Sequence, residues 1–198
     1  MYGIYNFLVH IYKKGCKNSM YTLRILSKKI SISILIIFLL GTASHFIYDL
    51  TGQLLIVGCL FPINESIWEH LKLLLIPMIA WWSIFYVRYS HKYNLNIDKW
   101  FSSSLVALIT SMYIQLSTFY IYTGAFNIEY LIIDILIFLL AVTLGQYMGL
   151  HFYKYGKEHN YKICILVILL IIILFIFMTF YPPHLPLFLD MKSGGYGL

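Results

Sequence analysis

The sequence carries little charge. Only 11% of its 198 residues are charged, against about 25% in an ordinary soluble domain, and only eight are acidic. The apolar fraction is 61%, more than a soluble fold of this length could bury. Because a bilayer accepts helices that are hydrophobic on every side, the composition predicts an integral membrane protein.

Cysteine pairs and the common catalytic motifs are also lacking. The three cysteines, Cys16, Cys59 and Cys164, form no C-x-x-C pair and no Cys/His spacing, which argues against a disulfide framework or a zinc knuckle. The chain has no H-E-x-x-H motif, serine elbow, phosphate loop or dinucleotide fingerprint. Acyl-serine and nucleotide-dependent reactions are therefore not expected.

Long apolar runs are present instead. Five are long enough to cross a hydrocarbon core of about 30 Å: residues 30–50, 71–90, 100–122, 130–150 and 163–181. A shorter run, residues 53–61, is expected to be interfacial or re-entrant. We therefore predict an all-α bundle over residues 30–181. A basic, partly amphipathic segment (1–29) precedes it and a tail (182–198) follows.

The basic residues predict the orientation of these spans. Twelve of the 14 lysines and arginines fall on one side, which leaves only Lys72 and Lys192 on the other. The positive-inside rule then places the N-terminus in the cytoplasm and the C-terminus outside the plasma membrane. Since topology accounts for the net charge of +6, the expected partner is the lipid bilayer and not a nucleic acid. No pattern indicates an oligomeric state.

The densest polar cluster, residues 62–72, directly precedes the second span. Ser66 followed three positions later by Glu69 is typical of a helix capping box. Trp68 and Lys72 suit the membrane interface. Much of the cluster can thus be interpreted as the start of a helix.

Helix capping does not explain why Glu65 and Glu69 are spaced one helical turn apart, or why His70 stands beside them. Such a pair repels unless a cation or a protonated histidine compensates it. His45 and Asp49, spaced i,i+4, lie at the same end of the first span. Carboxylates and imidazoles together are ligands for zinc or another divalent cation. We expect metal ligands among His45, Glu69, His70 and His184, and catalytic carboxylates among Glu65, Glu69, Asp49 and Asp134. A metal-free polar site and plain capping are the alternatives.

Further polar residues are expected at the same depth. Gln115 belongs to a polar stripe on the third span, whose other interpretation is contact between helices. The tail contains prolines and apolar residues, and it would bring His184, Asp190 and Tyr196 over the cluster if it folded back as a lid. Simple packing at the interface is the alternative. We assign Asn64, Gln115, Asp190 and Tyr196 to the polar site.

Several motifs together resemble an uncharacterised family of small prokaryotic multi-pass membrane proteins. They are H-x-x-Y-D at residues 45–49, N-E-S-x-W-E-H-L-K at 64–72, the Y-T-G turn at 122–124 and the tail P-P-x-x-P-L-F-x-D at 182–190. The resemblance runs from about Leu39 onward. It implies a multi-pass membrane fold and no particular activity.

Three functions fit these observations. The first is a divalent-metal-dependent hydrolase or transferase that acts on a lipid or lipid-linked substrate at the outer leaflet. The second is binding or transport of a cation or a small solute by the same cluster. The third is a membrane partner protein whose polar cluster stabilises the fold.

Overall fold

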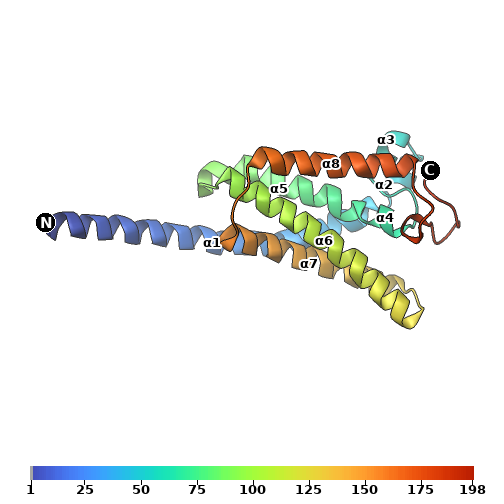
Figure 1. Ribbon diagram of the computed structural model, residues 1–198, viewed down its shortest axis with the longest axis horizontal. Coiled ribbons are helices and arrows are strands. Elements are labelled where there is room, and N and C mark those ends of the chain that lie inside the picture. Colours follow the sequence, from blue (N-terminus) through green and yellow to red (C-terminus); the bar gives the residue numbers. More distant parts are fainter. Residues whose placement is uncertain (1) are drawn as a thin grey trace.

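The computed structural model describes the backbone of residues 2–198 and the side chains of residues 21–198. The described chain is 76% helical and contains no strand. Figure 1 shows α1 (Tyr2–Ser44), α2 (Ile47–Leu50), α3 (Leu55–Gly58), α4 (Ile67–His70), α5 (Lys72–Tyr93), α6 (Ile97–Phe126), α7 (Leu131–Tyr155) and α8 (Tyr161–Phe180). A short 3-10 turn, η1 (Pro186–Phe188), lies in the C-terminal tail.

Among the described residues, four helical segments are long and apolar enough to cross a membrane. They are Ile67–Tyr93, Ile97–Phe126, Leu131–Tyr155 and Tyr161–Phe180. Each covers, to within one residue, one of the predicted spans from the second to the fifth, so the prediction of an all-helical chain with helices able to cross a membrane is confirmed. Of the predicted basic, partly amphipathic segment (1–29), residues 1–20 lie outside the described side chains.

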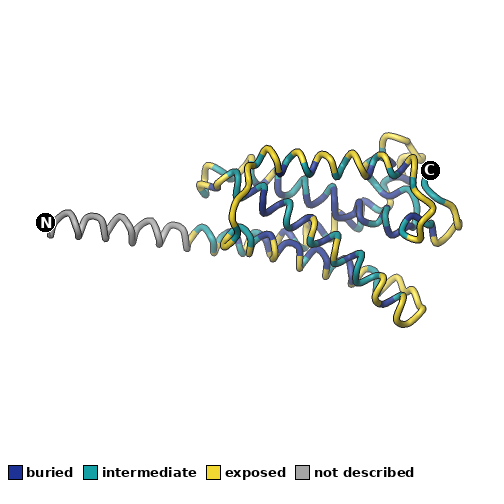
Figure 2. The backbone as a smooth tube through the Cα atoms, viewed as in Figure 1, coloured by how far each residue is buried: buried dark blue, intermediate teal, exposed yellow. Residues whose placement is uncertain are grey.

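The long helices form one bundle around a buried centre (Figure 2). The α6–α7 hairpin is its most extensive contact, α1 packs on α7 and α5, and α8 packs on α6. At the end that carries the C-terminal tail, here called the tail end, α6 and α7 diverge from α5 and α8 (Figure 1). This divergence separates the α6–α7 hairpin from the segments that follow α1.

Small residues allow α6 and α7 to pack closely. Gly145 and Gly149 are one turn apart on α7 and face α6. A Cβ atom at Gly145 would lie 2.6 Å from the carbonyl oxygen of Ala107, and one at Gly149 would lie 3.0 Å from that of Ser103. These are the close backbone approaches that small-xxx-small pairs allow between membrane helices.

The first helix ends earlier than the sequence predicts. The Thr42 hydroxyl donates to Phe38 O at 2.8 Å, and the Ser44 hydroxyl donates to Gly41 O at 2.7 Å. Such side-chain bonds compete with helical hydrogen bonding. The expected run over residues 30–50 is therefore two helices, α1 and α2, and His45 lies in the turn between them.

Candidate metal centre

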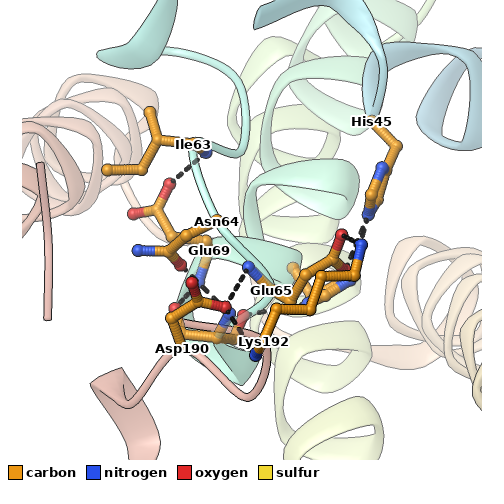
Figure 3. A network of polar contacts seen from close by, with 9 residues as sticks. His45, Ile63, Asn64, Glu65, Glu69, Asp190 and Lys192 are labelled. Atoms are coloured by element: carbon orange, nitrogen blue, oxygen red, sulfur yellow. Dashed lines mark hydrogen bonds and ion pairs between the residues drawn. The ribbon is translucent and has the colours of Figure 1, made fainter. Parts of the chain in front are cut away.

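Three side chains with metal-binding atoms converge at the tail end. His45 follows α1, Glu65 lies in the loop before α4, and His70 is the last residue of α4. His45 Nε2 lies 3.2 Å from His70 Nε2. Glu65 Oε2 lies 3.4 Å from His45 Nε2 and 3.5 Å from His70 Nε2. We call these residues the triad; Figure 3 shows His45 and Glu65 facing each other.

The triad has the dimensions of a tetrahedral metal site. Zinc bonds of about 2.0–2.1 Å to nitrogen and oxygen place neighbouring ligand atoms about 3.3–3.4 Å apart. Charge-assisted N–H···O⁻ bonds are shorter, at about 2.7–2.9 Å. The nearly equal sides of 3.2, 3.4 and 3.5 Å therefore match coordination better than hydrogen bonding to the carboxylate. Three protein ligands also leave a fourth position open.

Ser66 sets the orientation of His70. His70 Nδ1 lies 2.9 Å from the carbonyl oxygen of Ser66. A carbonyl only accepts, so Nδ1 carries a proton, and Nε2 of the neutral ring presents its lone pair to the triad. The Ser66 hydroxyl also caps α4 by accepting from Glu69 N–H at 3.3 Å. This bond forms half of the expected capping box, because Asn64 Oδ1 and not Glu69 accepts from Ser66 N–H.

The tail holds the third member of the triad in place. Lys192 Nζ donates to Glu65 Oε1 at 2.5 Å, and Glu65 N–H donates to Asp190 Oδ1 at 3.2 Å (Figure 3). Without a metal ion, a proton on His70 Nε2 is donated to Glu65; this interaction is the main cause that holds the pKa of Glu65 well below its usual range, it outweighs burial, and Lys192 adds to it. Glu65 is therefore ionised, and its free oxygen, Oε2, faces both imidazoles.

The tail is itself docked by several contacts. Asn64 Nδ2 donates to Gly197 O at 3.2 Å, and the ring of Phe188 packs on Trp68 with centroids 4.8 Å apart. Burial raises the pKa of Asp190, but hydrogen bonds from Ser193 and from backbone N–H groups outweigh it and lower that pKa below its ordinary value. The tail thus contacts the cluster before the second span through Asp190, Gly197 and Phe188.

A pocket of about 720 Å³ lies beside the triad. Its volume is typical of small-molecule sites, which range over about 300–1,000 Å³. Besides the triad, its polar lining consists of Thr42, Asp49, Gln115, Glu129, Asp134 and Lys192. Its apolar lining consists of Phe46, Ile67, Leu73, Phe119, Leu131, Ile135, Ile137, Phe138 and Met191. The pocket therefore combines an apolar wall with the candidate metal ligands.

Asp134 is held by a residue that the sequence alone did not single out as functional. The Tyr122 hydroxyl donates to Asp134 Oδ1 at 2.5 Å. Tyr122 is near the end of α6 and Asp134 is in the first turn of α7, so this bond closes the hairpin beside the pocket. In the sequence, Tyr122 belongs to the Y-T-G turn, one of the motifs shared with the uncharacterised family. That resemblance gave the residue no role.

The structure places Glu69 away from the triad. Glu69 Oε2 accepts from Lys72 Nζ at 2.7 Å and from Ile63 N–H at 3.1 Å. Lys72 also donates to Thr179 Oγ1 at 2.7 Å and to Gly58 O at 2.8 Å. Lys72 is fully buried, in contrast to its expected place at the membrane interface. Glu65 precedes the helical N-cap, so Glu65 and Glu69 do not share a helical face.

His184 is also not part of the triad. Its ring stacks on Tyr196 within the tail, with centroids 4.6 Å apart. Asp49, Asp134 and Gln115 line the pocket. The sequence does not predict Lys192 as a site residue, because its position in the chain indicates only that it lies on the less basic side of the membrane. Its contact with Glu65 depends on how the tail folds.

The comparisons with known proteins identify a family without a function. The chain matches a family model described as "Family of unknown function (DUF6512)" over residues 19–198. It therefore belongs to that family, in agreement with the expected uncharacterised family. No curated protein and no solved structure matches the chain.

Proposed function

We propose that this member of a family of unknown function is a divalent-metal-dependent hydrolase of the plasma membrane, acting on a lipid or lipid-linked substrate. The observation that carries the proposal is the triad: two imidazoles and a carboxylate with nearly equal separations at the wall of an apolar-lined pocket. Two histidines and one glutamate are a donor set of catalytic zinc sites. His45, Glu65 and His70 are thus the proposed ligands.

In the proposed topology, α1 is a fifth span. Its apolar side chains on the surface include Ile32, Leu35, Ile36, Leu39 and Leu40, each between 40% and 59% exposed. Side chains of this kind require lipid contact or a partner. Five spans with the basic segments in the cytoplasm place the triad, the pocket and the tail at the outer leaflet.

The roles of the individual residues follow from their positions. A bound divalent ion would supply a Lewis acid and a water of lowered pKa. His70 would be held for ligation by the Ser66 carbonyl, and Glu65 by Lys192 and Asp190. Asp134, fixed by Tyr122, is the proposed base that accepts a proton in the pocket. Asp49 is the second candidate carboxylate, and Glu69 is assigned to structure.

The first test is the metal content of the detergent-purified protein, measured by elemental mass spectrometry after loading with zinc and dialysis. We expect one ion per chain in the wild type and in His184→Ala, and none in His45→Ala/His70→Ala. His184→Ala is the matched control, because it removes a tail imidazole outside the triad. Circular dichroism and size-exclusion chromatography establish that each variant is folded.

A second measurement separates catalysis from simple binding. Zinc-loaded wild type is assayed against lipid esters and lipid phosphodiesters in mixed micelles, alongside Asp134→Asn. An enzyme should lose most of its turnover in Asp134→Asn while keeping the metal. Metal binding without turnover of any lipid would instead favour a cation-binding role, and a wild type that binds no metal would exclude the metalloenzyme.

A further inference from the structure

The lining of the pocket beside the triad combines two kinds of side chain. Its apolar lining includes aliphatic and aromatic side chains from α5, α6 and α7, among them Leu73, Phe119 and Phe138. Its polar lining consists of the triad together with other hydrogen-bonding groups. A ligand that contacts both kinds of side chain has an apolar part and a polar part, so it is an amphiphile.

The polar lining consists mainly of acceptors. Asp49, Glu129 and Asp134 contribute carboxylates in addition to Glu65, and among the side chains that the structure describes Lys192 is the one lysine that lines the pocket. The Lys192 ammonium is already bonded to Glu65 Oε1. Four carboxylates facing one ammonium group leave the pocket without net positive charge even when a divalent cation is bound. These carboxylates would repel an anionic head group, because the site is partly desolvated.

Gln115 is an independent sign that the polar lining binds a ligand. The residue is only 5% exposed and lines the pocket, and its side-chain Oε1 has no hydrogen-bond partner among the described residues. A buried acceptor without a partner is costly, and native structures rarely keep one unless it binds water or a ligand. A hydroxyl or ammonium group in the pocket would supply the missing donor.

We propose that the pocket binds a single-chain amphiphile whose head group donates hydrogen bonds and carries no net negative charge. Hydroxyl-bearing and amine-bearing head groups share this chemistry. The apolar chain lies along the apolar side chains of α5, α6 and α7, and the head group meets Gln115 and the carboxylates beside the triad. This inference rests on the proposed function only in calling the ligand a substrate.

The test compares three probes that have the same chain and contain no carboxylic ester: dodecylglycerol ether, dodecylamine and dodecyl phosphate. Binding to the full-length protein is measured by isothermal titration calorimetry in a fixed detergent, both with a chelator and with zinc. We expect the ether and the amine to bind at least about tenfold more tightly than the phosphate. Equal or tighter binding of the phosphate would overturn the proposal.

Variants show whether the probes occupy this pocket. Ile135→Trp fills it from an α7 position that is already 40% exposed, and it should abolish binding. Leu136→Trp is the matched control, because the next residue is 57% exposed and does not line the pocket. Gln115→Leu should weaken binding of the ether by about tenfold, the effect of one lost hydrogen bond. Ser117→Ala, which removes an α6 hydroxyl bonded to Tyr113 O, should have no effect.

The same experiment distinguishes failure of this inference from failure of the proposed function. Binding of the ether in chelator, by a protein that never takes up zinc, would support the inference and exclude the metalloenzyme. Uptake of zinc by a protein that binds neither the ether nor the amine would overturn the inference and support the proposed metal site. Identical binding by Ile135→Trp and Leu136→Trp would place the amphiphile elsewhere and overturn the inference.

Discussion

Glu65 and Glu69 stand four positions apart in the sequence, but their carboxylates belong to two separate clusters. Glu65 faces the imidazoles of His45 and His70, whereas Glu69 points away from them and is paired with the buried Lys72. The helix begins between them, with Ser66 as its N-cap. The expected repulsion between neighbouring carboxylates is thus avoided, because each one has its own cationic or hydrogen-bonding partners.

The buried pair of Glu69 and Lys72 should be important for stability. Replacing Lys72 by Met leaves the carboxylate buried without a cation, which costs about 3–5 kcal/mol in comparable buried pairs. Lys72→Met/Glu69→Leu removes both charges and should recover much of that loss. The measurement is the free energy of unfolding, obtained by titrating dodecyl sulfate into mixed micelles and recording circular dichroism.

The control for this pair is Lys192→Met, which removes a lysine from an exposed ion pair. Exposed pairs contribute little, so its effect on unfolding should be much smaller. If the losses in Lys72→Met and Glu69→Leu simply added in the double variant, the two side chains would not be energetically coupled and the prediction would be wrong.

The membrane class and most of the helices could be predicted from the sequence, because long apolar runs and helix caps are local signals. The residues of the site could be predicted in part. His45, His70 and Glu65 were all candidates, but Glu69 was the expected ligand in place of Glu65. The sequence allowed both a capping box that begins at Ser66 and a helical register extended back to Glu65. The structure has Ser66 as the N-cap, and that start decides which carboxylate faces the imidazoles.

The contacts of the tail could not be derived in the same way. Lys192 reaches Glu65 across 127 positions of sequence. The burial of Lys72 depends on Thr179 at the far end of α8. Both contacts follow from how the helices and the tail pack, which no local pattern encodes.

Metal binding and tail docking should be coupled. The tail positions Glu65 through Lys192 and Asp190, so Asp190→Asn/Lys192→Met should weaken zinc binding by about 10–100-fold, as loss of groups that orient metal ligands does. By the same coupling, bound zinc should protect the tail from proteolysis.

Competition with a fluorescent zinc chelator measures the affinity for zinc, and mass spectrometry of trypsin digests measures the protection of the tail. His184→Ala, also in the tail, should change neither; unchanged affinity in the double variant would exclude the coupling.

Tail docking should weaken in acid. The pKa of Asp190 is lowered in the folded protein, so its contribution is fully present above the ordinary aspartate pKa of about 3.9 and is lost as the pH falls below that value. In chelator-treated protein, pepsin should therefore release tail fragments increasingly below about pH 4.

Cleavage in the exposed loop at residues 127–130 serves as an internal reference for pepsin activity. Asp190→Asn should release the tail at every pH tested, whereas a wild-type tail released equally at all pH values would contradict the assignment.

Close packing of α6 and α7 should depend on Gly145, and these two helices carry Gln115 and Asp134, which both line the pocket. A methyl group at Gly145 would meet the Ser111 side chain and the Ala107 carbonyl, so Gly145→Ala should destabilise the protein by about 1–3 kcal/mol through overpacking. Gly124→Ala is the matched control: Gly124 is also helical, and no atom of the described residues lies within 4 Å of the added atom. There the change should be neutral or stabilising, because alanine favours helix. The two variants are compared by unfolding in dodecyl sulfate, and equal stability would show that the helices do not need the close approach.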